Sequence, residues 1–238
     1  MDEKIEKFKQ LVNESNNIVF FGGAGVSTES GIPDFRSKDG LYNQQYKYPP
    51  EEILSHSFFM NNTEEFYKFY KEKMNSLKYE PNVTHMKLAE LEREGKLKAV
   101  ITQNIDGLHQ KAGSKIVYEL HGSVLRNYCM DCDEFYDAEY VFNSDGVPKC
   151  SCGGIVKPDV VLYQEGLDDV TVKGAIEAIR NADLLIVAGT SLTVYPASGL
   201  INYFKGKHLV LINKDATQYD RVAELVINEG LGKVFGRI

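Results

Sequence analysis

Long apolar runs, frequent prolines and repeats are all missing from this sequence. None of its apolar runs approaches the ~18 residues of a membrane span, and its first residues lack the apolar segment of a secretion signal, so we expect a cytoplasmic protein that does not bind membranes. The chain has only 7 prolines, its 20 glycines follow no regular period, and 43% of its residues are hydrophobic. This composition excludes collagen-like, coiled-coil and disordered chains. The length of 238 residues predicts one large domain, or a large domain carrying a small one.

An excess of positive charge is also missing. The 27 Lys and Arg residues are outnumbered by 34 Asp and Glu, which gives a formal charge of -7. A protein that binds the nucleic-acid phosphate backbone needs the opposite balance, so direct nucleic-acid binding is not expected. The charge is compatible with a basic partner.

Cysteine is scarce, and its few copies are clustered. Cys129 and Cys132 form one pair and Cys150 and Cys152 a second, followed by Gly153-Gly154, which permits a tight turn. In a reducing compartment two close thiol pairs are typical of a zinc ribbon, with redox chemistry as the alternative. Four thiolates would leave no open coordination position, so the zinc is expected to be structural.

Short apolar runs alternate with helical patterns along most of the chain. This alternation predicts an α/β fold, a doubly wound parallel sheet of the Rossmann type. The runs expected as buried strands are 18–21, 99–102, 116–120, 160–163, 184–188 and 208–212. Helices are expected at about 3–13 and 172–181, and an aromatic-rich helical insertion begins at about residue 41.

The domain organisation follows from these patterns. Residues 1–40, 84–125 and 155–238 are expected to form the nucleotide-binding domain. Residues 41–83 would be the helical insertion and 126–154 the zinc ribbon. The insertion and the ribbon together would make a smaller lobe.

Two loops of small residues could hold a dinucleotide. Gly22 to Ser30 follows the first strand and is expected to lie at the start of a helix, where exposed backbone N–H groups bind anions. Gly189-Thr190-Ser191 follows another strand, and Asn213 ends the next one, as for a phosphate loop followed by a ribose contact. Glycines that merely permit positive φ remain the alternative.

Gly31 to Arg36 adds an unusual segment beyond the first loop. Phe35 could cover a planar ring, and Arg36 could bind a phosphate through two N–H groups. A solvent-facing turn with a surface ion pair is the alternative.

A histidine and three polar residues end two strands of the expected sheet. His121 follows the strand at 116–120, and Gln103, Asn104 and Asp106 follow the strand at 99–102. The carboxyl ends of parallel strands meet at one edge of a sheet, so these side chains should converge and His121 could remove a proton near pH 7. A structural histidine is the alternative, and His109 is the closest rival for the catalytic role.

These motifs occur together in one order. They are Gly23 to Arg36, Gln103 to His109, His121-Gly122, the four cysteines and Gly189 to Leu192. In this combination the chain resembles the sirtuins, NAD-dependent protein-lysine deacylases of bacterial type. The resemblance implies an enzyme that removes acetyl or other neutral acyl groups from lysine, giving nicotinamide, O-acyl-ADP-ribose and free lysine.

The resemblance also implies roles for individual residues. His121 would be the general base, with Asn104 beside it as the second catalytic residue. The residues implied to hold NAD are Ala24, Thr28, Phe35, Arg36, Gln103, Asn104, Ile105, Asp106, His121, Thr190, Ser191, Asn213 and Leu231. Of these, Phe35 would shield the nicotinamide, Ile105 and Asp106 would hold its carboxamide, and Leu231 would lie near the adenine.

The substrate side follows from the same resemblance. Val160, Val161, Leu162 and Tyr163 would pair with the backbone of an acyl-lysine protein or peptide as an added strand. Tyr163-Gln164-Glu165 stands where the family usually has Phe-Gly-Glu. Relatives that prefer acidic acyl groups carry a Tyr-x-x-Arg pair in the helical insertion, and residues 37–92 contain no arginine, so a neutral acyl group is favoured.

Two other functions stay open. One is mono-ADP-ribosyl transfer to protein, which cleaves the same bond but has no need for His121. The other is binding without catalysis, as an NAD sensor or a zinc-ribbon module for nucleic acid, which the acidic ribbon segment disfavours. A monomer is expected.

Overall fold

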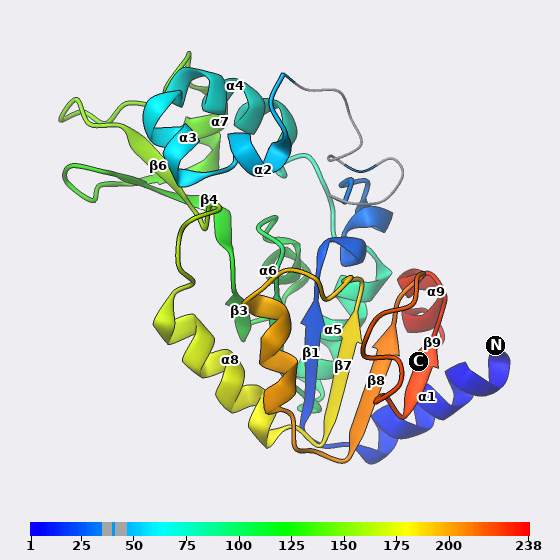
Figure 1. Cartoon of the computed structure of the whole chain (residues 1–238). Helices are drawn as coiled ribbons and strands as arrows, with labels where there is room; N and C mark the ends of the chain where they lie inside the picture. Colours follow the sequence, from blue (N-terminus) through cyan, green and yellow to red (C-terminus); the bar gives the residue numbers. More distant parts are fainter. Residues whose placement is uncertain (35–39, 41–46) are drawn as a thin grey trace.

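A parallel sheet forms the centre of the larger of two lobes. The computed structural model describes residues 1–34, 40 and 47–238. The sheet is six-stranded and all its pairs are parallel (Figure 1). Its strands are, in spatial order, β3 (Val117–Glu119), β2 (Leu97–Thr102), β1 (Ile18–Gly22), β7 (Leu184–Ala188), β8 (His208–Ile212) and β9 (Leu225–Ile227). The chain winds outward from β1 on one side and from β7 on the other, so the topological switch point lies between β1 and β7.

Helices cover both faces of this sheet, as expected for a doubly wound fold. One face packs against α1 (Asp2–Glu14), α5 (Val83–Arg93) and α9 (Leu231–Phe235), and the other against α8 (Asp169–Asn181) and η4 (Ala197–Tyr203). Consecutive strand residues such as Phe20 and Phe21 enter opposite cores, because side chains alternate along a strand. This double burial explains why the strands are continuous apolar runs.

The second lobe is built around a small antiparallel sheet. Its order is β5-β4-β6, and four helices cover it (Figure 1). The strands are β4 (Gly122–Cys129), β5 (Phe135–Asp137) and β6 (Val156–Val160), and the helices are α2 (Pro50–Ile53), α3 (His56–Asn61), α4 (Thr63–Lys73) and α7 (Ala138–Asn143). The aromatic side chains of the expected helical insertion form this lobe's core, where Phe66, Tyr67 and Tyr70 are buried.

Two expectations about local structure were wrong. The strand expected at 160–163 lies earlier, as β6, and pairs antiparallel with β4 in the small sheet instead of joining the large one. The loop after β1 forms two short 3-10 helices, η1 (Ala24–Val26) and η2 (Thr28–Ser30), instead of opening an α-helix, and Gly31 ends the second with a φ of 92°. Isolated apolar runs do not reveal which sheet a strand joins.

The small sheet crosses the expected domain limits. β4 begins at Gly122 and β6 at Val156, so strands of the small sheet lie in segments that we assigned to the nucleotide-binding domain. The division into domains stays a proposal. Within the described part of the chain, no helix has the length and apolar character needed to cross a bilayer.

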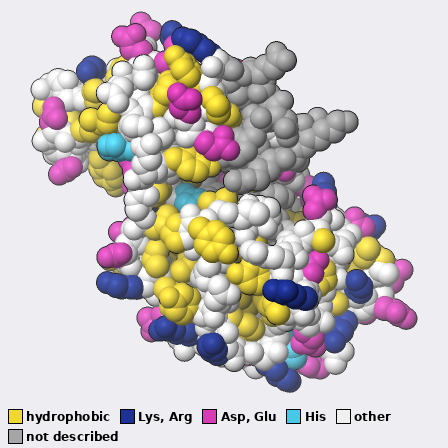
Figure 2. All heavy atoms as spheres, viewed as in Figure 1, with side chains coloured by type: hydrophobic (Ala, Val, Ile, Leu, Met, Phe, Trp, Pro, Cys, Tyr) yellow, Lys and Arg dark blue, Asp and Glu magenta, His cyan; other side chains and the backbone are white. Residues whose placement is uncertain are grey.

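Figure 2 shows hydrophobic side chains gathered where the two lobes meet on this face, while acidic and basic side chains are mixed over the larger lobe. Exposed aromatic residues of the chain include Tyr163, which follows β6, and Tyr195, in the loop before η4.

Candidate active site

The loops that follow β1 and β7 touch at the switch point. The Gly25 N–H donates to the Gly189 carbonyl at 2.8 Å, and the Gly23 N–H donates to the Ala188 carbonyl at 3.3 Å. A Cβ on Gly25 would lie 2.7 Å from the Cα of Gly189, closer than real side chains approach. Gly189 itself has a φ of 61°. These glycines are therefore needed because the backbones of the two loops cross in direct contact, and not only because a turn requires them. Backbone atoms, and not side chains, line the switch point here.

Polar side chains extend this crevice toward β2 and β8. Gln103 Nε2 donates to the Thr190 Oγ1 at 3.0 Å, and the Thr190 N–H donates to the Asn213 Oδ1 at 2.9 Å. The Nδ2 of Asn213 is buried and has no hydrogen-bond partner in the described part of the chain. A buried donor without an acceptor is costly, so this amide fits a ligand oxygen such as a ribose hydroxyl.

A second chain of hydrogen bonds links the loop after β1 to the loop after β2. Asn104 Nδ2 donates to Ser27 Oγ at 3.0 Å, and Ser27 Oγ donates to Asp106 Oδ2 at 2.6 Å. The other oxygen of Asp106 accepts from the Leu108 N–H at 2.9 Å. Burial raises the pKa of Asp106, while the bonds from Ser27 and Leu108 oppose that rise. Both carboxylate oxygens are thus held in place, and Asn104 is oriented by a fully buried serine.

His121 lies in the short connection between β3 and β4, where the chain passes from the large sheet to the small one. Its Nδ1 is 2.9 Å from the Gln103 carbonyl oxygen. A carbonyl oxygen only accepts, so Nδ1 carries the proton and Nε2 keeps its lone pair. Burial lowers the pKa of His121, and the bond to the Gln103 carbonyl opposes part of that shift. The ring is therefore neutral at pH 7 and prepared to accept a proton at Nε2.

The rival histidine is part of the core. His109 is 1% exposed and packs against Phe20 and against His85, with ring centroids 4.7 Å apart for the histidine pair. Burial lowers the pKa of His109 far below its ordinary value and that of His85 to about 4. Both rings are neutral packing residues, so the structure gives no support to His109 as a general base.

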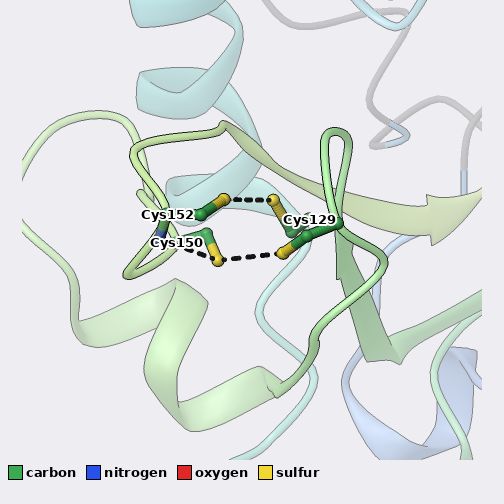
Figure 3. A group of neighbouring side chains, drawn as sticks. Cys129, Cys150 and Cys152 are labelled. Carbon is green, nitrogen blue, oxygen red and sulfur yellow. Dashed lines mark hydrogen bonds between the residues drawn. The ribbon is translucent and has the colours of Figure 1, made fainter.

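The four cysteines form a metal centre in the small lobe. Their Sγ atoms all lie within 4.8 Å of one another, with Cys129 and Cys152 at 3.5 Å and Cys132 and Cys150 at 3.5 Å (Figure 3). Zn–S bonds of about 2.3 Å in a tetrahedron place sulfurs about 3.8 Å apart, which matches this cluster. The four cysteines fit one structural zinc ion with no coordination position left for a substrate.

The other expected site residues contribute less to the hydrogen bonds described above at the switch point. Thr28 Oγ1 bonds the Gly25 carbonyl within its own loop, and Ser191 is exposed and bonds Thr193. Ile105 packs against the core of the small lobe, and Leu231 is buried in the core of the large one. Ala24 is half-buried in η1. Phe35 and Arg36 lie outside the described residues. Contacts of all seven with a ligand stay predictions.

The expected substrate segment is partly paired with its own chain. The Val161 N–H donates to the His121 carbonyl at 3.0 Å. Tyr163 donates to the Leu54 carbonyl and accepts from the His56 N–H, so its backbone is engaged by the connection between α2 and α3. Val160 ends β6, an edge strand, and Leu162 is buried. The backbones of Val161 and Tyr163 are therefore paired within the protein itself, and the side chain of Tyr163 is half-exposed.

Two connections between expected site residues and their surroundings were not found from the sequence. Ser27 connects Asn104 with Asp106, and the only available signal was a serine inside the small-residue loop. Arg126 joins Glu119 to Asp159 next to His121, and no local pattern marked it.

Taken together, the parallel sheet with two glycine loops in contact at its switch point and the small lobe with four clustered cysteines define a Rossmann-like protein with a metal-binding lobe. Comparison with known proteins agrees with this class. Residues 23–196 match the model of the Sir2 family, and the chain belongs to that family.

Curated relatives cover the chain almost completely. It is 63% identical over 100% of its length to the NAD-dependent protein deacetylase of Clostridium perfringens, of which 99% is covered. The NAD-dependent protein deacetylase of Cutibacterium acnes is 52% identical over 98% of this chain and 96% of its own.

Solved structures agree. A Sir2 complex with deacetylated p53 peptide and 3′-O-acetyl-ADP-ribose has a TM-score of 0.90 and 41% identity, covering 98% of this chain and 96% of that chain. A Sir2 complex with a p53 peptide and NAD+ has a TM-score of 0.87 and 41% identity, with the same coverage.

Proposed function

We propose that this protein is an NAD-dependent deacetylase that removes acetyl or other neutral acyl groups from protein lysines. The observation that carries the proposal is the position of His121, a half-buried histidine whose protonated Nδ1 faces the Gln103 carbonyl and whose Nε2 keeps its lone pair at the carboxyl edge of the parallel sheet. The names of the close relatives support the same activity.

The residues around the switch point fit NAD. Bound NAD supplies a ribose that accepts the acyl group once the bond to nicotinamide is broken. The crossing of Gly25 and Gly189 lets backbone approach a phosphate, and the unpartnered Asn213 amide suits a ribose hydroxyl. Asn104, held by Ser27, and Asp106 with both oxygens fixed would orient the nicotinamide half.

The chemistry assigned to His121 is proton removal. In the order implied by the family, His121 would act after the acyl oxygen has taken the place of nicotinamide on the ribose. Its Nε2 would then take the proton of the ribose hydroxyl that attacks the acyl carbon, so that the acyl group passes to the ribose and the lysine amine is released. A site that excludes water is needed for the first step, because water would otherwise compete for the ribose carbon.

The substrate is proposed to be an acyl-lysine protein or peptide bound along β6. β6 lies at the edge of the small sheet, and edge strands accept an added strand. Pro158 within β6 fits an edge position, because proline cannot donate to a neighbouring strand. A solved Sir2 structure is bound to an acetylated peptide, which agrees with this substrate class.

A neutral acyl group is favoured by the small lobe. Tyr67 and Tyr70, the tyrosines of the helical insertion that could start a Tyr-x-x-Arg pair, are buried in the small-lobe core, and Tyr67 donates to the Val156 carbonyl. Position 73, three residues after Tyr70, is a lysine paired with Glu72. Residues 37–92 contain no arginine that could bind an acyl carboxylate.

The decisive experiment is an acyl-peptide panel. Acetyl-, butyryl- and succinyl-lysine peptides are incubated with protein and NAD, nicotinamide release is followed, and the ribose product is identified by mass spectrometry. We expect O-acetyl-ADP-ribose and free lysine, with succinyl peptide much slower than acetyl peptide. ADP-ribose attached to protein without lysine deacylation would favour ADP-ribosyl transfer instead. Binding of NAD without release of nicotinamide would favour an NAD sensor.

A further inference from the structure

His121 is carried by the connection between two sheets, and one arginine bridges the sheets beside it. Glu119 ends β3 of the large sheet, while Arg126 and Asp159 lie on β4 and β6 of the small one. Arg126 NH1 is 2.7 Å from Glu119 Oε2, and Arg126 Nε is 2.8 Å from Asp159 Oδ2. One guanidinium therefore holds a carboxylate from each sheet.

This ion-pair network is not an ordinary surface pair. The side chain of Glu119 is only 8% exposed, against 39% for Arg126 and 44% for Asp159. A nearly buried carboxylate is costly without a partner, and a guanidinium offers two fixed donor directions that a flexible ammonium lacks. Glu119 also lies close enough to Asp106 to raise that residue's pKa, which places the network at the margin of the nicotinamide half of the site.

The network and His121 are mechanically connected through Gly122. A Cβ on Gly122 would lie 1.9 Å from the Asp159 carbonyl oxygen, so the two backbones are in contact where β4 begins. On the other side of His121, the Leu120 N–H donates to the Thr102 carbonyl, and the Val161 N–H binds the His121 carbonyl. Displacement of either Glu119 or Asp159 would move one end of the short segment that carries His121.

We infer that Arg126 is a positioning residue for His121: its bridge between Glu119 and Asp159 holds the connection between the two sheets so that the imidazole keeps its place over the crevice. The inference rests on the proposed function. Arg126 does not contact the reacting groups, and it acts only through the segment 119–122.

The test separates the two chemical steps. Since His121 acts after nicotinamide has left, a misplaced imidazole should slow acyl removal and spare the exchange of labelled nicotinamide into NAD. For Arg126→Met we expect kcat for deacetylation to fall by at least about tenfold, because a shift of about 1 Å at a reacting group can cost ~100-fold. Nicotinamide exchange and the KM for NAD should change by less than about threefold. Arg126→Lys, which can hold one carboxylate but not both, should recover part of the loss.

Arg237→Met is the matched control, because Arg237 also binds two carboxylates, those of Asp2 and Glu6, at the far end of α9. It should leave both reactions unchanged. Deacetylation at the wild-type rate in Arg126→Met would overturn the inference, and so would an equal loss of exchange and deacetylation, which indicates a structural role alone. A wild-type protein without NAD-dependent deacetylation would overturn the proposed function itself, and with it this inference.

Discussion

His121 is held at two points, and neither of these bonds uses its Nε2. Its ring donates to the Gln103 carbonyl, and its backbone carbonyl accepts from Val161. We expect His121→Ala to lower kcat for deacetylation by about 10²–10⁴-fold, the usual contribution of a general base, with an unchanged unfolding temperature. Steady-state assays with acetyl peptide measure this. His208→Ala, whose ring pairs with Glu224 at the sheet edge, is the control. Full activity of His121→Ala would remove the imidazole from the mechanism.

The protonation of His121 sets the pH dependence. A base acts only in its neutral form, and burial lowers the pKa of His121 below its ordinary value of 6.5. We therefore expect kcat/KM for deacetylation to rise with pH through a midpoint below 6.5 and to be level at pH 7. The profile is measured with a peptide that contains no histidine. A midpoint above pH 7 would contradict the neutral ring.

Ser27 is the residue on which the Asn104–Asp106 arrangement depends. Ser27→Ala leaves a buried oxygen of Asp106 without its donor and the Asn104 amide without its acceptor. We expect a loss of about 1–3 kcal/mol in unfolding free energy and a higher KM for NAD. Ser198→Ala is matched, because Ser198 is also fully buried but its hydroxyl has no partner among the described residues. Denaturant unfolding and NAD titration should distinguish the two variants. Equal stability and equal NAD binding would contradict a role for Ser27 in holding Asn104 and Asp106.

At the scale of elements, the contact between the loops after β1 and β7 is the most demanding feature. Gly25→Ala would place a methyl group 2.7 Å from the Gly189 Cα, so the loops must separate. Strain of this kind costs about 1–3 kcal/mol, and we expect the KM for NAD to rise as well.

Gly199→Ala is the control for this prediction, because a Cβ there meets Tyr195 at an ordinary 3.8 Å. Thermal unfolding and the KM for NAD are compared for both variants. If Gly25→Ala is as stable and as active as Gly199→Ala, the crossing does not shape the nucleotide site.

At the scale of the whole molecule, the metal site holds the small lobe together. The cysteine cluster joins the turn after β4 to the turn before β6, and β4 begins next to His121. We expect one zinc per chain by elemental analysis. Chelation should lower the unfolding temperature by about 4–8 °C, corresponding to about 2 kcal/mol in a chain of this size, and abolish deacetylation. Added zinc should restore both. A metal-free protein with unchanged stability and activity would disprove the structural role.

Much of the fold was visible in local patterns. Five of the expected strands lie in the large sheet close to their expected limits, because strands buried on both faces must be continuous apolar runs. The helix expected at about 3–13 is α1, and it buries Ile5, Phe8, Leu11 and Val12, whose spacing places them on one face. The small-lobe strand β6 was misplaced because its pattern carries no information about its partner.

The sequence by itself determined the parallel sheet, the four thiol ligands and the glycine loops, because each depends on residues close together in the chain or on one residue type. Only the tertiary structure decided that Ser27 orients Asn104, 77 residues away, and that Arg126 joins Asp159, 33 residues away, to Glu119. Such contacts depend on how the two sheets pack, and no local spacing of residues encodes that packing.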